Sequence, residues 1–106
     1  MKIWPFFVSL GMGCSVYILY SNVLDRFYIG QTKDLNERIL LHLEKQFEDS
    51  FTTRADDWVL FHSVACTTRS QAMQIERHIK KMKSRKYILD VKEYPEISDK
   101  LKIKYP

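Results

Sequence analysis

The stretch SVYILYSNVLDRFYIGQT, residues 15–32, decides the fold of this chain. Its two ends, residues 16–21 and 27–31, are rich in β-branched and aromatic side chains, which favour strands. The segment between them, residues 22–26, carries Asn, Asp and Arg and is typical of a turn. We therefore predict an antiparallel β-hairpin.

A helix is predicted directly after the hairpin. Asp34 is a good N-cap residue, and Glu37, three residues later, completes a capping box. Leu35, Ile39 and Leu43 recur at helical spacing and would share one buried face.

The second half of the chain returns to a strand and then to a helix. Residues 58–66 have strand composition and follow a polar connection, residues 48–57. Ser70 is the expected N-cap of the second helix. The buried stripe of that helix would consist of Ala72, Ile75, Ile79 and Met82. The order β-β-α-β-α predicts an α+β fold, a small three-stranded antiparallel sheet flanked by helices.

A chain of 106 residues is long enough for one domain with a modest core. We place that domain at residues 14–90, with a short helix or loop around residues 87–91. A charged C-terminal tail, residues 91–106, would follow. Residues 1–13 loosely resemble a signal peptide, but the apolar stretch is short and contains Pro5. We therefore favour a non-essential N-terminal extension over export.

The two cysteines, Cys14 and Cys66, are too few for a zinc site, which needs four ligands in close pairs. Reduced thiols packed in strands are a better interpretation than a disulfide. No segment reaches the roughly 18 apolar residues that span a bilayer. We expect no membrane contact and a cytoplasmic location.

The net charge of +4 leaves two explanations open, a polyanionic partner or merely a basic surface. The distribution is more informative, because residues 77–86 contain six cations and no acidic residue. The six are Arg77, Lys80, Lys81, Lys83, Arg85 and Lys86.

Two triplets carry a family resemblance. Residues 15–17, Ser-Val-Tyr, and residues 28–30, Tyr-Ile-Gly, resemble the paired signature of the GIY-YIG nuclease superfamily. The resemblance extends over residues 14–88 and includes matches at residues 30–35, 38–42, 70–73 and 76. Within the superfamily, the chain most resembles the small stand-alone bacterial proteins related to the nuclease domain of the excision-repair nuclease. It departs from the family in the first triplet, which is not Gly-Ile-Tyr, and in lacking a clear counterpart of an asparagine downstream of the glutamate.

The resemblance implies a metal-dependent DNA endonuclease that hydrolyses phosphodiester bonds. Cleavage would be structure-dependent or weakly sequence-specific, in DNA repair or processing. The family's active-site set, carried over position by position, is Tyr17, Tyr28, Arg38, His42 and Glu76. Glu76 would be the sole protein carboxylate on a Mg²⁺ or Mn²⁺ ion.

The same residue types suit phosphodiester hydrolysis on chemical grounds. Arg38 offers a planar fork for the non-bridging phosphate oxygens. Glu76 is a hard oxygen ligand for Mg²⁺, which completes its shell with water and phosphate. Tyr17 could orient or deprotonate the attacking water, and Tyr28 could orient the phosphate. His42, one turn beyond Arg38, could relay a proton or hold a tyrosine hydroxyl.

Each of these residues has a simpler explanation when taken alone. Tyrosines in strands usually pack. Arg38 and His42 on one helical face usually form a solvated stripe, and Glu76 among cations usually forms a surface ion pair. The joint occurrence, in the expected order and elements, favours the active site.

The expected partner is DNA, and recruitment by a second protein is compatible with so small a domain. The predicted nucleic-acid contacts are Gly30, Arg26, Lys80, Lys81, Lys83, Arg85 and Lys86. The main alternative is a catalytically inactive nucleic-acid-binding module, and a weaker one is a protein-interaction domain with a basic helix. The oligomeric state is not readable from the sequence.

Overall fold

A computed structural model describes residues 14–38 and 54–106 of the chain. One antiparallel sheet is formed by β1 (Cys14–Ser21), β2 (Arg26–Thr32) and β3 (Val59–Cys66). The strand order is β2-β1-β3, so β1 is central and β2 lies at an edge. The predicted hairpin and third strand are thus confirmed. Cys14 and Cys66 are neighbours across β1 and β3, and both are free thiols, as expected.

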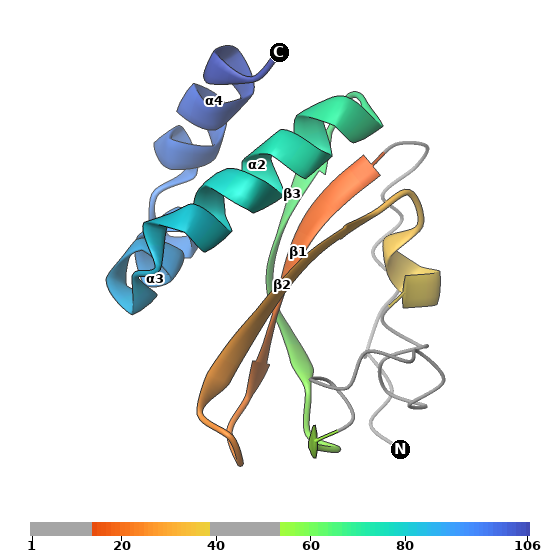
Figure 1. Cartoon of the computed structure of the whole chain (residues 1–106), viewed down its shortest axis with the longest axis vertical. Helices are drawn as coiled ribbons and strands as arrows, with labels where there is room; N and C mark the ends of the chain where they lie inside the picture. The colour runs from red at the N-terminus through yellow and green to blue at the C-terminus, as the bar shows by residue number, and fades with distance from the viewer. Residues whose placement is uncertain (1–13, 39–53) are drawn as a thin grey trace.

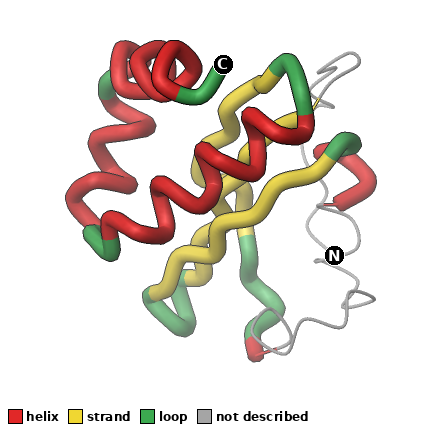
Figure 2. Tube along the Cα trace, turned by 45° about the horizontal axis from the view of Figure 1, so that its top comes forward, coloured by secondary structure: helices red, strands yellow, loops and turns green. Residues whose placement is uncertain are grey.

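Helices α2 (Arg69–Met82), α3 (Arg85–Glu93) and α4 (Pro95–Lys104) follow the third strand. In Figure 1, α2 crosses one face of the sheet, with α3 and α4 beyond it. Figure 2 shows the same helix lying across the strands. The α+β fold class is confirmed. None of the helices in residues 14–38 and 54–106 is long and apolar enough to cross a bilayer.

The sheet buries apolar side chains on both faces, because successive residues of a strand point to opposite sides. The face covered by α2 holds a cluster that includes Val16, Ile18, Ile29, Ile75 and Ile79. The second face gathers Tyr17, Leu19, Leu35, Ala55 and Trp58. Tyr17 therefore lies on the side of the sheet away from α2.

The predicted first helix begins where the capping pattern indicates. Asp34 Oδ1 accepts a hydrogen bond from the backbone N–H of Glu37 at 3.1 Å, and residues 35–38 form a helical turn. Leu35, at 4% exposure, buries this turn against the second face. The predicted positions Ile39 and Leu43 lie outside the described residues.

The N-cap of α2 is Thr68, and the prediction of Ser70 was wrong. Thr68 Oγ1 accepts a hydrogen bond from the backbone N–H of Gln71 at 3.1 Å. Both residue types can cap a helix, but Thr68 has the extended backbone of an N-cap, with φ −134° and ψ 160°. Ser70 lies inside the first turn instead.

The buried stripe of α2 ends one turn earlier than predicted. Ala72, Ile75 and Ile79 are buried as expected, but Met82 is 45% exposed. The helix ends at Met82, and Lys83 adopts a left-handed conformation, with φ 48°. The chain therefore turns away before Met82 can reach the core.

The segment expected to be a charged tail contains α4. Pro95 stands in its first turn, where a proline is well tolerated, and Leu101 is buried at 5% exposure. The side-chain amide of Gln71 donates to the carbonyl oxygens of Lys102 at 3.4 Å and of Tyr105 at 3.0 Å. Contacts with α2 therefore hold α4 against the domain.

Candidate active site

The ring of Tyr17 reaches from the central strand onto the edge strand. Tyr17 faces Gly30 across β1 and β2, so the two residues project from the same side of the sheet. A Cβ atom on Gly30 would lie 2.5 Å from Tyr17 Oη and 2.6 Å from its Cζ. The Tyr17 hydroxyl therefore occupies the space that a side chain on Gly30 would fill. Gly30 seats the tyrosine, and its predicted contact with nucleic acid stays a prediction.

We expect Gly30→Ala to destabilise the fold by about 1–3 kcal/mol, as overpacking typically does. The added methyl group would force the Tyr17 ring to move, and urea unfolding would measure the loss. In a Tyr17→Leu background the same substitution should cost clearly less, because the clashing ring is gone. An equal cost in both backgrounds would contradict this explanation.

Tyr28 and Trp58 extend the aromatic cluster around Tyr17. The ring centroids of Tyr17 and Tyr28 are 6.3 Å apart, and those of Tyr28 and Trp58 are 6.4 Å apart. Tyr17 is only 1% exposed, whereas Tyr28 is half-buried. The two predicted tyrosines are therefore brought together, and Tyr28 is the more accessible of the pair.

Arg38 lies on the same side of the sheet as Tyr17. It belongs to the helical turn whose Leu35 packs in the Tyr17 cluster. Side chains three residues apart in a helix leave it on neighbouring parts of its surface. The backbone N–H of Arg38 donates to the carbonyl oxygen of Asp34 at 3.1 Å, which fixes the turn that carries the guanidinium.

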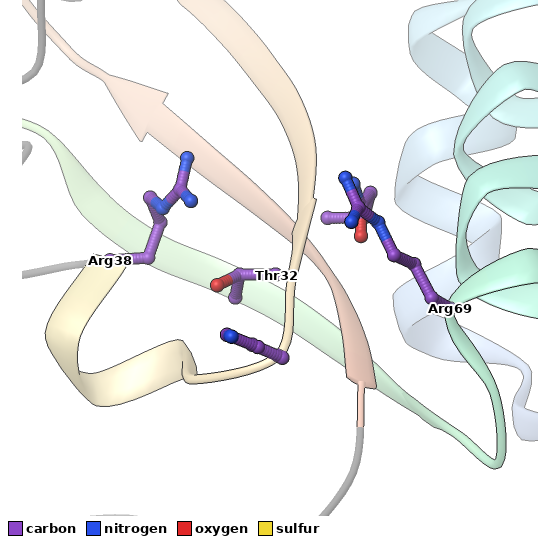
Figure 3. A pocket seen from close by; sticks show the side chains of 5 residues that line it. Thr32, Arg38 and Arg69 are labelled. Atoms are coloured by element: carbon purple, nitrogen blue, oxygen red, sulfur yellow. The ribbon is translucent and has the colours of Figure 1, made fainter.

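A cavity of about 160 Å³ opens at the end of β2, lined by Gln31, Thr32, Lys33, Arg38 and Arg69. Figure 3 shows Arg38 and Arg69 on opposite sides of the strand end, with Thr32 between them. Gln31 and Thr32 are consecutive strand residues and point to opposite faces. This β2-end cavity therefore wraps around the edge of the sheet.

Arg69 was missed by the sequence reasoning. It precedes the buried stripe of α2, in a polar segment that carries no periodic pattern. One signal was available: Arg69 stands seven residues before Glu76. Seven residues are close to two helical turns, so the two side chains share one side of the helix.

Glu76 lies on the side of α2 that faces the edge strand. It is about 10 Å along the helix axis from Arg69, which lines the β2-end cavity. His78, two residues further on, points the other way, and its Nδ1 lies 3.0 Å from the hydroxyl of Tyr105. Glu76 therefore approaches β2 from the face opposite to Tyr17 and Arg38, and only the edge strand separates the two groups.

Lys80 forms an ion pair with Glu76. Its Nζ lies 2.6 Å from Glu76 Oε2, and the two side chains are 53% and 20% exposed. Pairs at this helical spacing contribute only about 0.2–0.5 kcal/mol. The carboxylate is thus oriented by Lys80 but can exchange this partner at little cost.

The other cations of the predicted nucleic-acid interface differ in their surroundings. Lys81 and Lys83 are exposed at the end of α2. Lys86 pairs with Asp90, with 3.0 Å between Nζ and Oδ2. Arg85 donates to Asp25 Oδ1 at 2.9 Å and to the carbonyl oxygen of the same residue at 2.7 Å.

Arg85 fastens α3 to the hairpin turn. Asp25 also accepts a hydrogen bond from the hydroxyl of Tyr20 at 2.6 Å. This bond, together with those from Arg85, holds the pKa of the Asp25 carboxyl below its usual value. Arg26 starts β2 at this same end, about 20 Å along the strand from the β2-end cavity. DNA contacts by Arg26 and Arg85 stay predictions, and neither residue lines the cavity.

His42 lies outside the described residues. Its predicted place, one turn beyond Arg38, therefore stays a prediction.

The surroundings of Glu76 fit a magnesium site with one protein carboxylate. Within residues 14–38 and 54–106, no three His, Cys, Asp or Glu side chains come together as a ligand group. Mg²⁺ commonly keeps several waters and takes further oxygen atoms from substrate phosphates. The partly exposed carboxylate of Glu76, at the edge of the sheet and beside a cationic cavity, suits that kind of binding.

Comparison with known protein families agrees with this geometry. The family model described as the GIY-YIG catalytic domain matches residues 13–88. Neither a curated protein nor a solved structure matches the chain. The matched range contains the three strands, α2 and all of the predicted site residues.

Proposed function

The chain belongs to the GIY-YIG family of nucleases, and we propose that it is a metal-dependent DNA endonuclease that hydrolyses phosphodiester bonds. The observation that supports this best is the convergence on the edge strand. Tyr17 and Arg38 approach β2 from one face, and Glu76 approaches it from the other. A DNA strand laid across this edge would meet all three.

Arg38 would bind the non-bridging oxygens of the scissile phosphate, because its fork matches two oxygen atoms and its charge offsets the charge that develops there. The Tyr17 hydroxyl, seated over Gly30, would orient the attacking water or accept its proton. Tyr28 would orient the phosphate, and His42 would relay a proton or hold a tyrosine hydroxyl. Glu76 would hold Mg²⁺ or Mn²⁺, which when bound supplies positive charge to the phosphoryl and leaving oxygens.

So small a domain has little surface for reading bases, so we propose structure-dependent or weakly specific cleavage. A role in DNA repair or processing, recruitment by a protein partner and a cytoplasmic location belong to the same proposal.

Incubation with supercoiled, flapped and branched DNA tests the proposal. We expect cleavage in Mg²⁺ or Mn²⁺, none in a chelator, and none by Glu76→Ala. Binding without cleavage under all of these conditions would favour the inactive binding module. Cleavage that persists undiminished in the chelator would contradict the metal dependence.

We expect the exposed end of α2 to bind the phosphate backbone. Replacing Lys80, Lys81 and Lys83 with glutamine should weaken DNA binding almost equally across sequences. The slope of log affinity against log salt should fall by roughly one unit per lost phosphate contact. Titrations at several salt concentrations would measure it.

A matched control removes three lysines from α4, namely Lys100, Lys102 and Lys104. It changes the net charge equally but lies on another helix. Equal slopes for the two triple variants would mean that net charge alone, rather than a binding face on α2, controls affinity.

A further inference from the structure

The β2-end cavity concentrates positive charge in a hollow. Three of its five lining residues are cationic, namely Lys33, Arg38 and Arg69, and none is acidic. Like charges brought together repel one another, so such a group is more stable when an anion lies between its members. At about 160 Å³ the cavity has room for roughly five water volumes, or for a hydrated phosphate group.

The polar side chains of the cavity have different duties. Thr32 Oγ1 accepts a hydrogen bond from the backbone N–H of Asp34 at 3.1 Å and lies 3.2 Å from the carbonyl oxygen of the same residue. Its hydroxyl is therefore used in shaping the loop that leads to Arg38. Arg69, in contrast, has no hydrogen bond or ion pair within the part of the chain that the structure describes. Its guanidinium is exposed and available to a ligand.

The position of Arg69 relates the cavity to the proposed catalytic residues. Arg38 lines the cavity from the Tyr17 side of the sheet, and Arg69 lines it from the α2 side. Glu76 stands on the same side of α2, about 10 Å along the axis. A strand whose scissile phosphate lies against Arg38 and Glu76 would thus pass its next phosphate close to Arg69.

We propose that the β2-end cavity binds a second backbone phosphate of the DNA strand, next to the scissile one, and that Arg69 is its main ligand. This inference rests on the proposed endonuclease function, because that function assigns the scissile phosphate to Arg38. Arg69 is a binding residue, which holds the strand in register without touching the reacting atoms.

The test uses Arg69→Gln and measures binding in the absence of divalent metal, so that cleavage does not interfere. We expect the variant to bind duplex and branched DNA about tenfold more weakly, as the loss of one charge-assisted contact implies. Arg69→Lys should fall between the variant and the parent, because it keeps the charge and loses the fork. In saturating single-turnover cleavage, Arg69→Gln should stay within about threefold of the parent, because uniform binding energy does not alter the chemical step.

A scan with single methylphosphonates, which are uncharged, locates the contact. At one phosphate position the substitution should weaken parent binding about tenfold and Arg69→Gln binding not at all. Arg77→Gln, which removes the same side chain two turns further along α2, should keep the full loss at that position. The inference is overturned if Arg69→Gln binds like the parent, or if it loses affinity equally with the parent at every position.

The scan also separates this inference from the proposed function. If the parent cleaves DNA but Arg69 shows no position-specific loss, only the inference fails. If the parent binds DNA and never cleaves it, the endonuclease proposal fails, while the methylphosphonate scan still decides whether Arg69 holds a phosphate.

Discussion

Glu76→Gln is expected to abolish DNA cleavage and to leave DNA binding largely intact. The amide keeps the size of the carboxylate but loses the negative charge that a magnesium ligand needs. No substitute is at hand in the matched motifs, because the Asp34 carboxylate caps the helical turn after β2. Cleavage of supercoiled DNA, with binding measured in parallel, tests the expectation.

The folding of this variant should be unaffected. The ion pair with Lys80 that it loses is partly exposed and contributes only about 0.2–0.5 kcal/mol. Glu37→Gln, which also neutralises one exposed glutamate, is the control and should cleave normally. Nicking by Glu76→Gln at the parent rate would remove Glu76 from the metal site.

The parts of the fold that the sequence predicts well are those in which local preference and burial agree. Residues 16–21 and 27–31 have strand composition, and burial on both faces of the sheet suits their apolar side chains. Ala72, Ile75 and Ile79 likewise combine helical spacing with burial. A single chain of residues carries both signals, so no distant contact is needed to find these elements.

The parts that escaped prediction depend on distant contacts. Helix α4 has a charged sequence and is held by Leu101 and by hydrogen bonds from Gln71, which is 31 residues away from Lys102. Its place in the fold cannot be read from residues 91–106 alone. The role of Gly30 also needs the register, because only the pairing with Tyr17 shows which ring fills its empty side-chain position.

The candidate site follows the same rule. The residues in the matched motifs could be named from sequence, but their convergence on the edge strand could not. Arg69 became visible only when its side chain was found in the same cavity as Arg38. Conversely, Arg85 appeared to be one more cation in a basic run, and its bonds to Asp25 give it a structural duty at the hairpin turn.

Arg38→Ala is expected to lower the rate of cleavage by roughly two to three orders of magnitude, because charge stabilisation at the reacting phosphate is usually a large contribution. The substitution leaves Leu35 and the Asp34 cap in place, so the helical turn should survive. Arg38→Lys should recover part of the rate, since it restores the charge without the bidentate fork. Single-turnover cleavage at saturating protein concentration isolates this step from binding.

The matched control is Arg77→Ala, which removes the same exposed side chain from a position outside the β2-end cavity. It should affect binding at most, with a normal rate at saturation. The Arg38 and Arg69 variants should also differ in kind, because Arg38 would contact the reacting phosphate and Arg69 its neighbour. A loss that appears only in affinity for Arg38→Ala would place Arg38 with the binding residues and would require another cation at the scissile phosphate.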